Sequence, residues 1–248
     1  MEISMWETQL IMDQRLLDKN WRLRHLYTIK DRNQNKIQFK PNRAQQHFNA
    51  NKHTRNIILK SRRLGFTTFE AIDMLDDTLF SPNFSGLIIN YERGEAIDIF
   101  KEKIQFAWMN FPDELKSLYR LDSEQSGRLT FDFGDKTVSS IAVAVSGRGG
   151  SNNRIHLTEL GKMAKKYPSD AEEFVSGTIP SVPLSGRIDI ESTAEGQQGL
   201  LYKMFWEAWN RKRDPFPTEF KAHFYNWTWD DDEMSKVITL IPVEDMEQ

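Results

Sequence analysis

The sequence predicts an α/β fold in which a mostly parallel central sheet is flanked by helices. Short apolar runs alternate along the chain with longer amphipathic stretches, as expected where helical crossovers join parallel strands. One apolar run, at 56–60, passes through a glycine-containing loop directly into a helical stretch. With 248 residues, of which 39% are hydrophobic, the chain is long enough to build its own core.

The predicted elements follow one another in a regular order. Apolar residues at helical spacing indicate an N-terminal helix or two within residues 8–28. Strands are predicted at 56–60, 86–91, 139–145, 155–158 and 187–191. Helices are predicted at 67–80, 93–110 and 171–175. Residues 128–145, with a turn at Gly134-Asp135, are predicted to form a hairpin that joins the sheet.

Three regions are expected along the chain. These are an N-terminal helical segment at 1–35, a core at 36–212, and a lid or linker region at 213–248. The basic stretch at 15–63 could face a phosphate backbone or be a solvated helix face, so charge alone does not decide the function.

Composition excludes several classes of protein. The sequence contains no cysteine, which excludes disulfides, thiolate catalysis and cysteine-ligated metals. Its apolar runs are far shorter than the roughly 18–20 residues that span a bilayer, and the mean hydropathy is -0.61. The polar N-terminus, with Glu2 and Glu7, does not fit a signal peptide. A protein of the cytosol, without a membrane partner, is expected.

The most informative segment is the loop after the first predicted core strand. Loops between a strand and a helix bind phosphate through converging backbone N–H groups, and their usual pattern is GxxxxGK(S/T). Gly65 and Thr67 match this pattern, but Phe66 stands where the lysine is usual and Lys60 where the first glycine is usual. Lys60 could still reach the β- and γ-phosphates, Thr67 could bind Mg²⁺, and Arg62 or Arg63 could add charge. The alternative is a basic surface turn. The predicted nucleotide-binding residues of this loop are Lys60, Ser61, Arg62, Arg63, Leu64, Gly65, Phe66, Thr67 and Thr68.

The stretch Lys60-Ser61-Arg62-Arg63-Leu64-Gly65-Phe66-Thr67-Thr68 resembles the deviant Walker A motif of the large terminase subunits of tailed bacteriophages, in which the lysine moves to the start of the loop. Residues 39–45 resemble the adenine-recognising Q motif of these ATPases. The resemblance implies that Gln45 binds adenine, because an amide offers both a donor and an acceptor. The alternative is a surface glutamine at a helix start, with Gln46 as its neighbour.

Two further stretches carry the resemblance. Residues 153–159 resemble a Walker B motif, which implies that Glu159 orients the attacking water and contacts the metal. Thr158 stands in place of the usual aspartate, and His156 is interpreted as a strand residue. Residues 188–196 resemble the coupling motif, which implies that Ser192 and Thr193 link hydrolysis to motion on DNA; a Ser-Thr pair there could also be a helix cap.

One arginine is a candidate for completing a neighbouring subunit's site. Arg148 lies in a glycine-rich stretch before the Walker B motif, where the family has a trans-acting finger, and such a residue contributes about 10³–10⁵ in rate. Arg154 is the competing candidate, and a solvated arginine on a turn is the plain alternative.

The resemblance covers most of the chain, from Phe39 to about Trp227. It implies a P-loop ATPase of the additional-strand, catalytic-glutamate type with a small C-terminal lid, using ATP and Mg²⁺ to drive double-stranded DNA into a procapsid. Implied partners are the portal protein, the small terminase subunit and further copies in a ring, expected to be a pentamer, with a monomer in isolation. The expected location is the host cytoplasm at the procapsid portal, and no nuclease activity is expected from this chain.

Two alternatives to a packaging ATPase are kept. The first is the motor domain of a DNA helicase or translocase. The second is a non-hydrolysing P-loop module that binds DNA as a scaffold, which Phe66 and Thr158 favour because both depart from the usual ATPase pattern.

Overall fold

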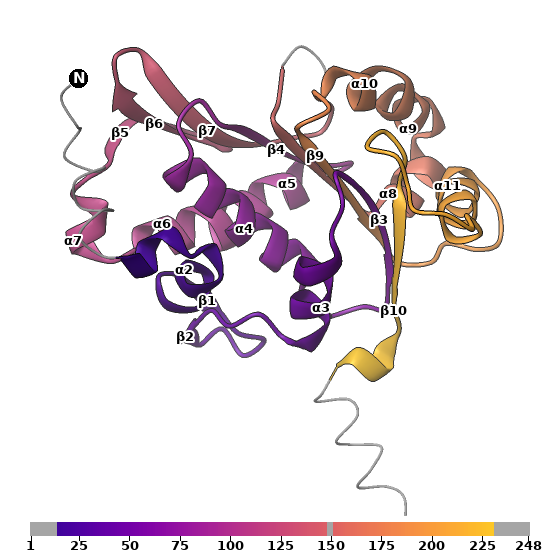
Figure 1. Ribbon diagram of the computed structural model, residues 1–248, viewed down its shortest axis with the longest axis horizontal. Helices are drawn as coiled ribbons and strands as arrows, with labels where there is room; N and C mark the ends of the chain where they lie inside the picture. The colour runs from indigo at the N-terminus through magenta and orange to yellow at the C-terminus, as the bar shows by residue number, and fades with distance from the viewer. Residues whose placement is uncertain (1–13, 148–150, 231–248) are drawn as a thin grey trace, which may run out of the picture.

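The computed structural model describes residues 14–147 and 151–230 and has at its centre one eight-stranded sheet (Figure 1). The strand order is β10-β3-β9-β8-β4-β7-β6-β5. The strands are β3 (Arg55–Lys60), β4 (Ser85–Asn90), β5 (Arg120–Gln125), β6 (Arg128–Gly134), β7 (Thr137–Ala144), β8 (Arg154–Thr158), β9 (Arg187–Ser192) and β10 (Lys221–Tyr225). The strands from β10 to β7 are parallel, and β6 and β5 extend the sheet antiparallel. A separate antiparallel pair precedes them, β1 (Thr28–Lys30) and β2 (Lys36–Gln38).

Helices cover both faces of the sheet. One face carries η1 (Gln14–Leu17), α2 (Lys19–His25), α3 (Arg43–Asn51), α4 (Phe66–Phe80), α5 (Arg93–Ile99), the π-helix η2 (Phe100–Gln105) and α6 (Phe106–Met109), followed by the short α7 (Asp113–Lys116). The other face carries α8 (Leu160–Lys166), α9 (Pro168–Glu173), the π-helix η3 (Phe174–Thr178), α10 (Ile179–Ser181) and α11 (Leu200–Trp209) (Figure 1). The 3₁₀ turn η4 (Trp227–Trp229) follows β10.

The hydrophobic core is divided by the sheet into two layers. Ile58 of β3 and Ile88 of β4 pack in the layer that contains α4. Their chain neighbours Ile57 and Leu87 point to the opposite layer, which contains α8 and α11. Because both faces are covered, these strands are continuous apolar runs, as is typical of buried parallel strands.

The α/β fold with a mostly parallel sheet is confirmed. The five predicted strands correspond to β3, β4, β7, β8 and β9, and the predicted hairpin is β6–β7. The predicted helix at 93–110 is continued through a π-helical segment. The expected N-terminal helices appear as η1 and α2, while residues 1–13 lie outside the described part.

The sequence analysis did not predict β5, β10 or the β1–β2 pair. Residues Lys221–Tyr225 fall in the segment assigned to a lid or linker, and they form the edge strand beside β3. The described ranges contain no helix with the length and hydropathy of a membrane span.

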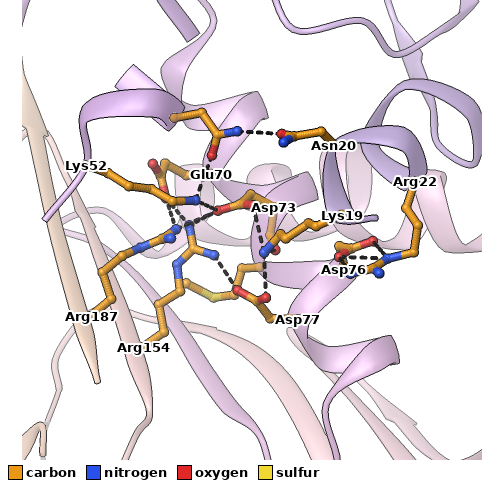
Figure 2. Close-up of polar contacts among 12 residues, drawn as sticks. Lys19, Asn20, Arg22, Lys52, Glu70, Asp73, Asp76, Asp77, Arg154 and Arg187 are labelled. Carbon is orange, nitrogen blue, oxygen red and sulfur yellow. Dashed lines mark hydrogen bonds and ion pairs between the residues drawn. The ribbon is translucent and has the colours of Figure 1, made fainter. Parts of the chain in front are cut away.

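A layer of charge with a buried centre at Glu70, Asp73, Arg154 and Asp189 lies between α4 and the starts of β8 and β9 (Figure 2). Its acids are Glu70, Asp73, Asp77 and Asp189, and its bases are Lys19, Lys52, Arg154 and Arg187. Arg154 is 2% exposed, and its guanidinium lies 2.8 Å from both Asp73 Oδ2 and Asp77 Oδ2. Burial raises the pKa of Glu70, whereas Lys19 and Arg154 outweigh burial and lower the pKa of Asp73.

The same acidic helix anchors the N-terminal segment. Arg22 of α2 lies 2.6 Å from Asp76 Oδ2, and the Tyr27 hydroxyl donates to Asp76 Oδ1 at 2.8 Å. Asp76 itself is fully buried. Since an unpaired buried carboxylate is strongly unfavourable, these contacts hold α2 against α4.

We expect Arg154→Met to lower the free energy of unfolding by about 3–5 kcal/mol, because it leaves several buried carboxylates without their shared cation. Urea denaturation measures the change. The matched control is Arg120→Met, since the Arg120 side chain is 80% exposed and its removal should change stability by less than about 0.5 kcal/mol. Equal effects of the two substitutions would contradict a stabilising role for the buried layer.

Candidate functional site

The candidate site lies where the carboxyl ends of β3, β9, β8 and β4 meet. β3 leads through the loop at 61–65 into α4, and β8 leads through Glu159 into α8. β9 ends at Ser192, between these two strands. Because parallel strands end at the same edge of the sheet, the sequence-predicted residues of three separate segments are gathered here.

The loop at 61–65 turns into α4 through two residues with a left-handed backbone. Gly65 has φ +71°, and a Cβ at this position would lie 2.7 Å from Gln45 Nε2, so a larger residue would be strained and would displace the Gln45 amide. Arg63 is also left-handed, with φ 67°. No side chain in the described part of the chain caps α4, which leaves the N–H groups of its first turn available to a phosphate.

The loop side chains divide into buried and exposed sets. Leu64 and Phe66 are buried, and the Phe66 ring packs 5.0 Å from that of Tyr225, so the residue in the usual lysine position faces the core. Arg62 and Arg63 are exposed, and Thr68 is half-buried. Because the side chains of Leu64 and Phe66 are buried, these two predicted nucleotide-binding residues can contact a phosphate only through their backbone.

Lys60 lies between two carboxylates. Its Nζ is 3.6 Å from Glu159 Oε1 and 3.8 Å from Glu191 Oε2. The Thr67 hydroxyl, in the first turn of α4, donates to Glu191 Oε1. The structure therefore brings together the displaced lysine, the predicted metal-binding threonine and the predicted catalytic glutamate.

Glu159 has a strained backbone at the turn between β8 and α8. Its φ of 57° is left-handed, and its N–H donates to the Glu191 carbonyl at 2.7 Å. Non-glycine residues rarely adopt this conformation, and those that do are concentrated at functional sites. The Thr193 hydroxyl donates to Glu159 Oε2 at 3.2 Å, and Lys162 Nζ lies 3.6 Å from the same oxygen.

Ser192 joins β9 to the start of α8. Its Oγ accepts from the Gly161 N–H at 3.0 Å and donates to the Thr193 carbonyl at 2.9 Å. A Cβ on Gly161 would lie 2.9 Å from Ser192 Oγ, so α8 approaches β9 closely at this point. The two predicted coupling residues therefore both contact the turn that carries Glu159.

Thr158, in the place of the usual aspartate, is part of a polar row. Its Oγ1 accepts from Asn90 Nδ2 at 2.9 Å, and Asn90 also donates to Glu95 Oε2 at 3.1 Å. A cavity of about 290 Å³ opens beside Thr67, Thr158 and Glu159. A larger cavity of about 690 Å³ is lined by residues 194–199, which follow Thr193 in the chain, and by side chains of α8 and α11.

Glu191 was missed by the sequence analysis. It is 1% exposed, and although burial opposes its ionisation, Lys60 and His156 lower its pKa to about 2. His156 is a fully buried strand residue whose Nε2 lies 3.4 Å from Glu191 Oε1. The available signal was an acid at the carboxyl end of an apolar strand, directly before Ser192.

Gln45 lies behind the loop and is 4% exposed. Its Nε2 donates to the carbonyls of Gly65 and Leu64 at 2.9 and 3.3 Å, and its Oε1 accepts from Asn42 N at 3.0 Å. The amide thus braces the loop from the first turn of α3, and its role with adenine stays a prediction.

The two arginine-finger candidates have different outcomes. Arg148 lies outside the described residues. Arg154 begins β8 at the opposite edge of the sheet, where it is buried and paired with four carboxylates. The proposal of Arg154 as a finger is wrong, because a guanidinium committed to buried acids cannot reach a neighbouring subunit.

The residues at the sheet edge fit a magnesium–nucleotide complex. Among the described residues, no cluster of three or more His, Cys, Asp and Glu is placed to hold a metal ion alone. Mg²⁺ is usually bound through one or two carboxylates together with substrate phosphates, and Thr67, Glu159 and Glu191 supply that kind of oxygen set. Ser61 Oγ and Glu191 Oε2 are buried at this edge without a hydrogen-bond partner in the described part of the chain.

Solved structures share this fold. The ATPase domain of the large terminase of Thermus phage P74-26 is similar with a TM-score of 0.59 and 16% identity, over 85% of this chain and 92% of that chain. An arginine-to-alanine variant of the same domain is similar with a TM-score of 0.60 and 17% identity over the same shares. No protein-family model and no curated protein matches the sequence. The chain thus has the fold of a phage large terminase ATPase domain.

We expect Gln45→Ala to weaken the binding of ATP and GTP by the same factor, on the order of tenfold, because the amide supports the loop through two neutral hydrogen bonds. Competition titrations with both nucleotides measure the ratio of their affinities. Gln46→Ala is the matched control, since Gln46 is exposed and donates to the Pro41 carbonyl. A selective loss of ATP binding would show instead that Gln45 recognises adenine.

Proposed function

We propose that the chain is the ATP-hydrolysing domain of a viral DNA-packaging motor of the large terminase type. The observation that carries the proposal is Lys60, held between Glu159 and Glu191 at the start of a strand-to-helix loop. The shared fold with a terminase ATPase domain supports it.

In this proposal the β- and γ-phosphates bind at the N-terminus of α4. The N–H groups of the first helical turn and the helix dipole attract the anion, and the Lys60 ammonium neutralises part of its charge. The exposed Arg62 and Arg63 add positive potential at the loop. When bound, Mg²⁺ supplies further charge neutralisation at the phosphates, and Thr67 and Glu159 would help to hold it.

Glu159 is proposed to orient and polarise the attacking water. Thr193 holds one oxygen of its carboxylate, and the strained turn fixes the direction of the side chain. Phosphoryl transfer requires little covalent chemistry from the protein, so positioning and charge provide most of the rate. Thr193 and Ser192 connect this carboxylate with β9 and α8, which makes them the proposed path from hydrolysis to motion.

The packaging context is proposed on the same basis. It comprises double-stranded DNA, the portal protein of a procapsid in the host cytoplasm, the small terminase subunit and a ring of copies, proposed to be a pentamer. Arg148 is proposed to act in trans within that ring, so the isolated monomer should hydrolyse ATP slowly. A helicase motor and a non-hydrolysing scaffold are the competing functions.

We expect Lys60→Ala to weaken the Mg²⁺-dependent binding of a non-hydrolysable ATP analogue by roughly 10–100-fold, which corresponds to losing a charge-assisted hydrogen bond. Isothermal titration calorimetry measures the affinity. Lys101→Ala, which removes an exposed lysine from η2, is the control and should bind as the wild type does. Binding that is unaffected by Lys60→Ala, or no binding by the wild type, would favour the scaffold.

We expect Glu159→Gln to retain nucleotide affinity and to lower turnover by about 10²–10⁴-fold, because the amide cannot accept a proton from water. Phosphate release at high protein concentration, with and without double-stranded DNA, measures the rate. Glu172→Gln, an exposed position on α9, should keep the wild-type rate. Turnover that survives Glu159→Gln would remove Glu159 from this role.

A further inference from the structure

Glu191 and Thr158 are direct neighbours across the sheet. In the register of β8 and β9, Thr158 pairs with Glu191, and on the other side of β9 Glu191 pairs with Ile58 of β3. Register partners in a parallel sheet project to the same face. The carboxylate of Glu191 therefore lies one strand nearer to the phosphate loop than the position at which an aspartate is usual.

The Glu191 carboxylate is only half satisfied. Its Oε1 accepts from the Thr67 hydroxyl, whereas Oε2 has no hydrogen-bond partner within 14–147 and 151–230, and Lys60 Nζ lies 3.8 Å from it. A buried polar atom without a partner is unfavourable by about 1–3 kcal/mol, and by more where it is charged. Such an atom in a nucleotide site indicates a cationic ligand that completes it.

The contact with Thr67 also determines what its hydroxyl can do. A threonine hydroxyl has one proton and two lone pairs, and here the proton is donated to Glu191. Both lone pairs are left for a cation at the start of α4. Thr158 cannot replace the Glu191 carboxylate beside Thr67, because it carries no charge and its oxygen accepts a hydrogen bond from Asn90.

We propose that Glu191 supplies from β9 the carboxylate that β8 lacks: it orients Thr67 and completes the site for the divalent cation that accompanies the nucleotide. This inference rests on the proposed function, since the cation is the one bound together with ATP or ADP. Glu191 is a positioning residue for Thr67, and its second oxygen, Oε2, lies 3.8 Å from Lys60 Nζ in the same site.

A purely structural role for Glu191 predicts different behaviour. If the residue only balanced Lys60 and His156, its substitution would lower stability and leave the cation affinity of the nucleotide complex unchanged. If Glu191 acts at the cation site, its substitution weakens cation binding, while the protein still folds and binds ADP without metal. The two roles can therefore be separated without measuring turnover.

The test titrates Mn²⁺ into the ADP complex and follows free Mn²⁺ by electron paramagnetic resonance, with ADP affinity in EDTA measured in parallel. We expect Glu191→Gln to weaken Mn²⁺ binding by about 10–100-fold, the range found when a group that orients a metal ligand is removed. The double variant Glu191→Gln with Thr158→Asp should recover most of the loss, because it returns the carboxylate to the paired position on β8. Glu195→Gln, at a partly exposed acid beyond β9 that pairs with Lys165, is the control and should bind Mn²⁺ normally.

Unchanged Mn²⁺ affinity in Glu191→Gln, with ADP bound, would overturn the inference and leave the proposed function standing. Absence of ADP binding by the wild type would overturn both. If Glu191→Gln does not fold, Glu191→Asp keeps the charge beside Lys60 but shortens the reach to Thr67. It should weaken Mn²⁺ binding by about tenfold, and wild-type affinity in that variant would likewise contradict the proposal.

Discussion

The position of α4 depends on the buried charge between that helix and the sheet. A helix with Glu70, Asp73 and Asp77 on its inner face can pack against a sheet only if cations meet those acids. Arg154 and Arg187 provide them from the starts of β8 and β9. Since Thr67 lies in the first turn of this helix, the ionic layer also determines where the candidate metal ligand stands.

α4, β8 and β9 therefore carry two polar centres, with the layer of charge at one end and the candidate site at the other. β8 begins with Arg154 and leads into Glu159, and β9 begins with Arg187 and leads into Ser192 and Thr193. Anchoring at one end gives a rigid frame at the other, which phosphoryl transfer requires because its catalysis depends on positioning.

Sequence reasoning identified the elements whose residues are close together in the chain. The strand at 56–60 and the loop after it were predictable, because a run buried on both faces and a glycine turn are local patterns. β10 was not, since it is a five-residue edge strand whose Phe224 is exposed. Glu191 was missed for another reason, which is that its partner Thr67 lies 124 positions away. Contacts of that kind depend on strand order, which no local pattern contains.

The two departures from the usual phosphate-site pattern compensate for each other in space. With Phe66 packed in the core, the cation comes from Lys60 at the end of β3, and with Thr158 uncharged, the acid comes from the adjacent β9. The positive charge of Lys60 and the negative charge of Glu191 thus lie on the neighbouring strands β3 and β9. Lys60, Glu159 and Glu191 together carry the same three charges as the ordinary arrangement with Lys, Asp and Glu. Electrostatic complementarity to a magnesium–phosphate complex constrains the charges and their separation, and it leaves the chain free to supply them from different strands.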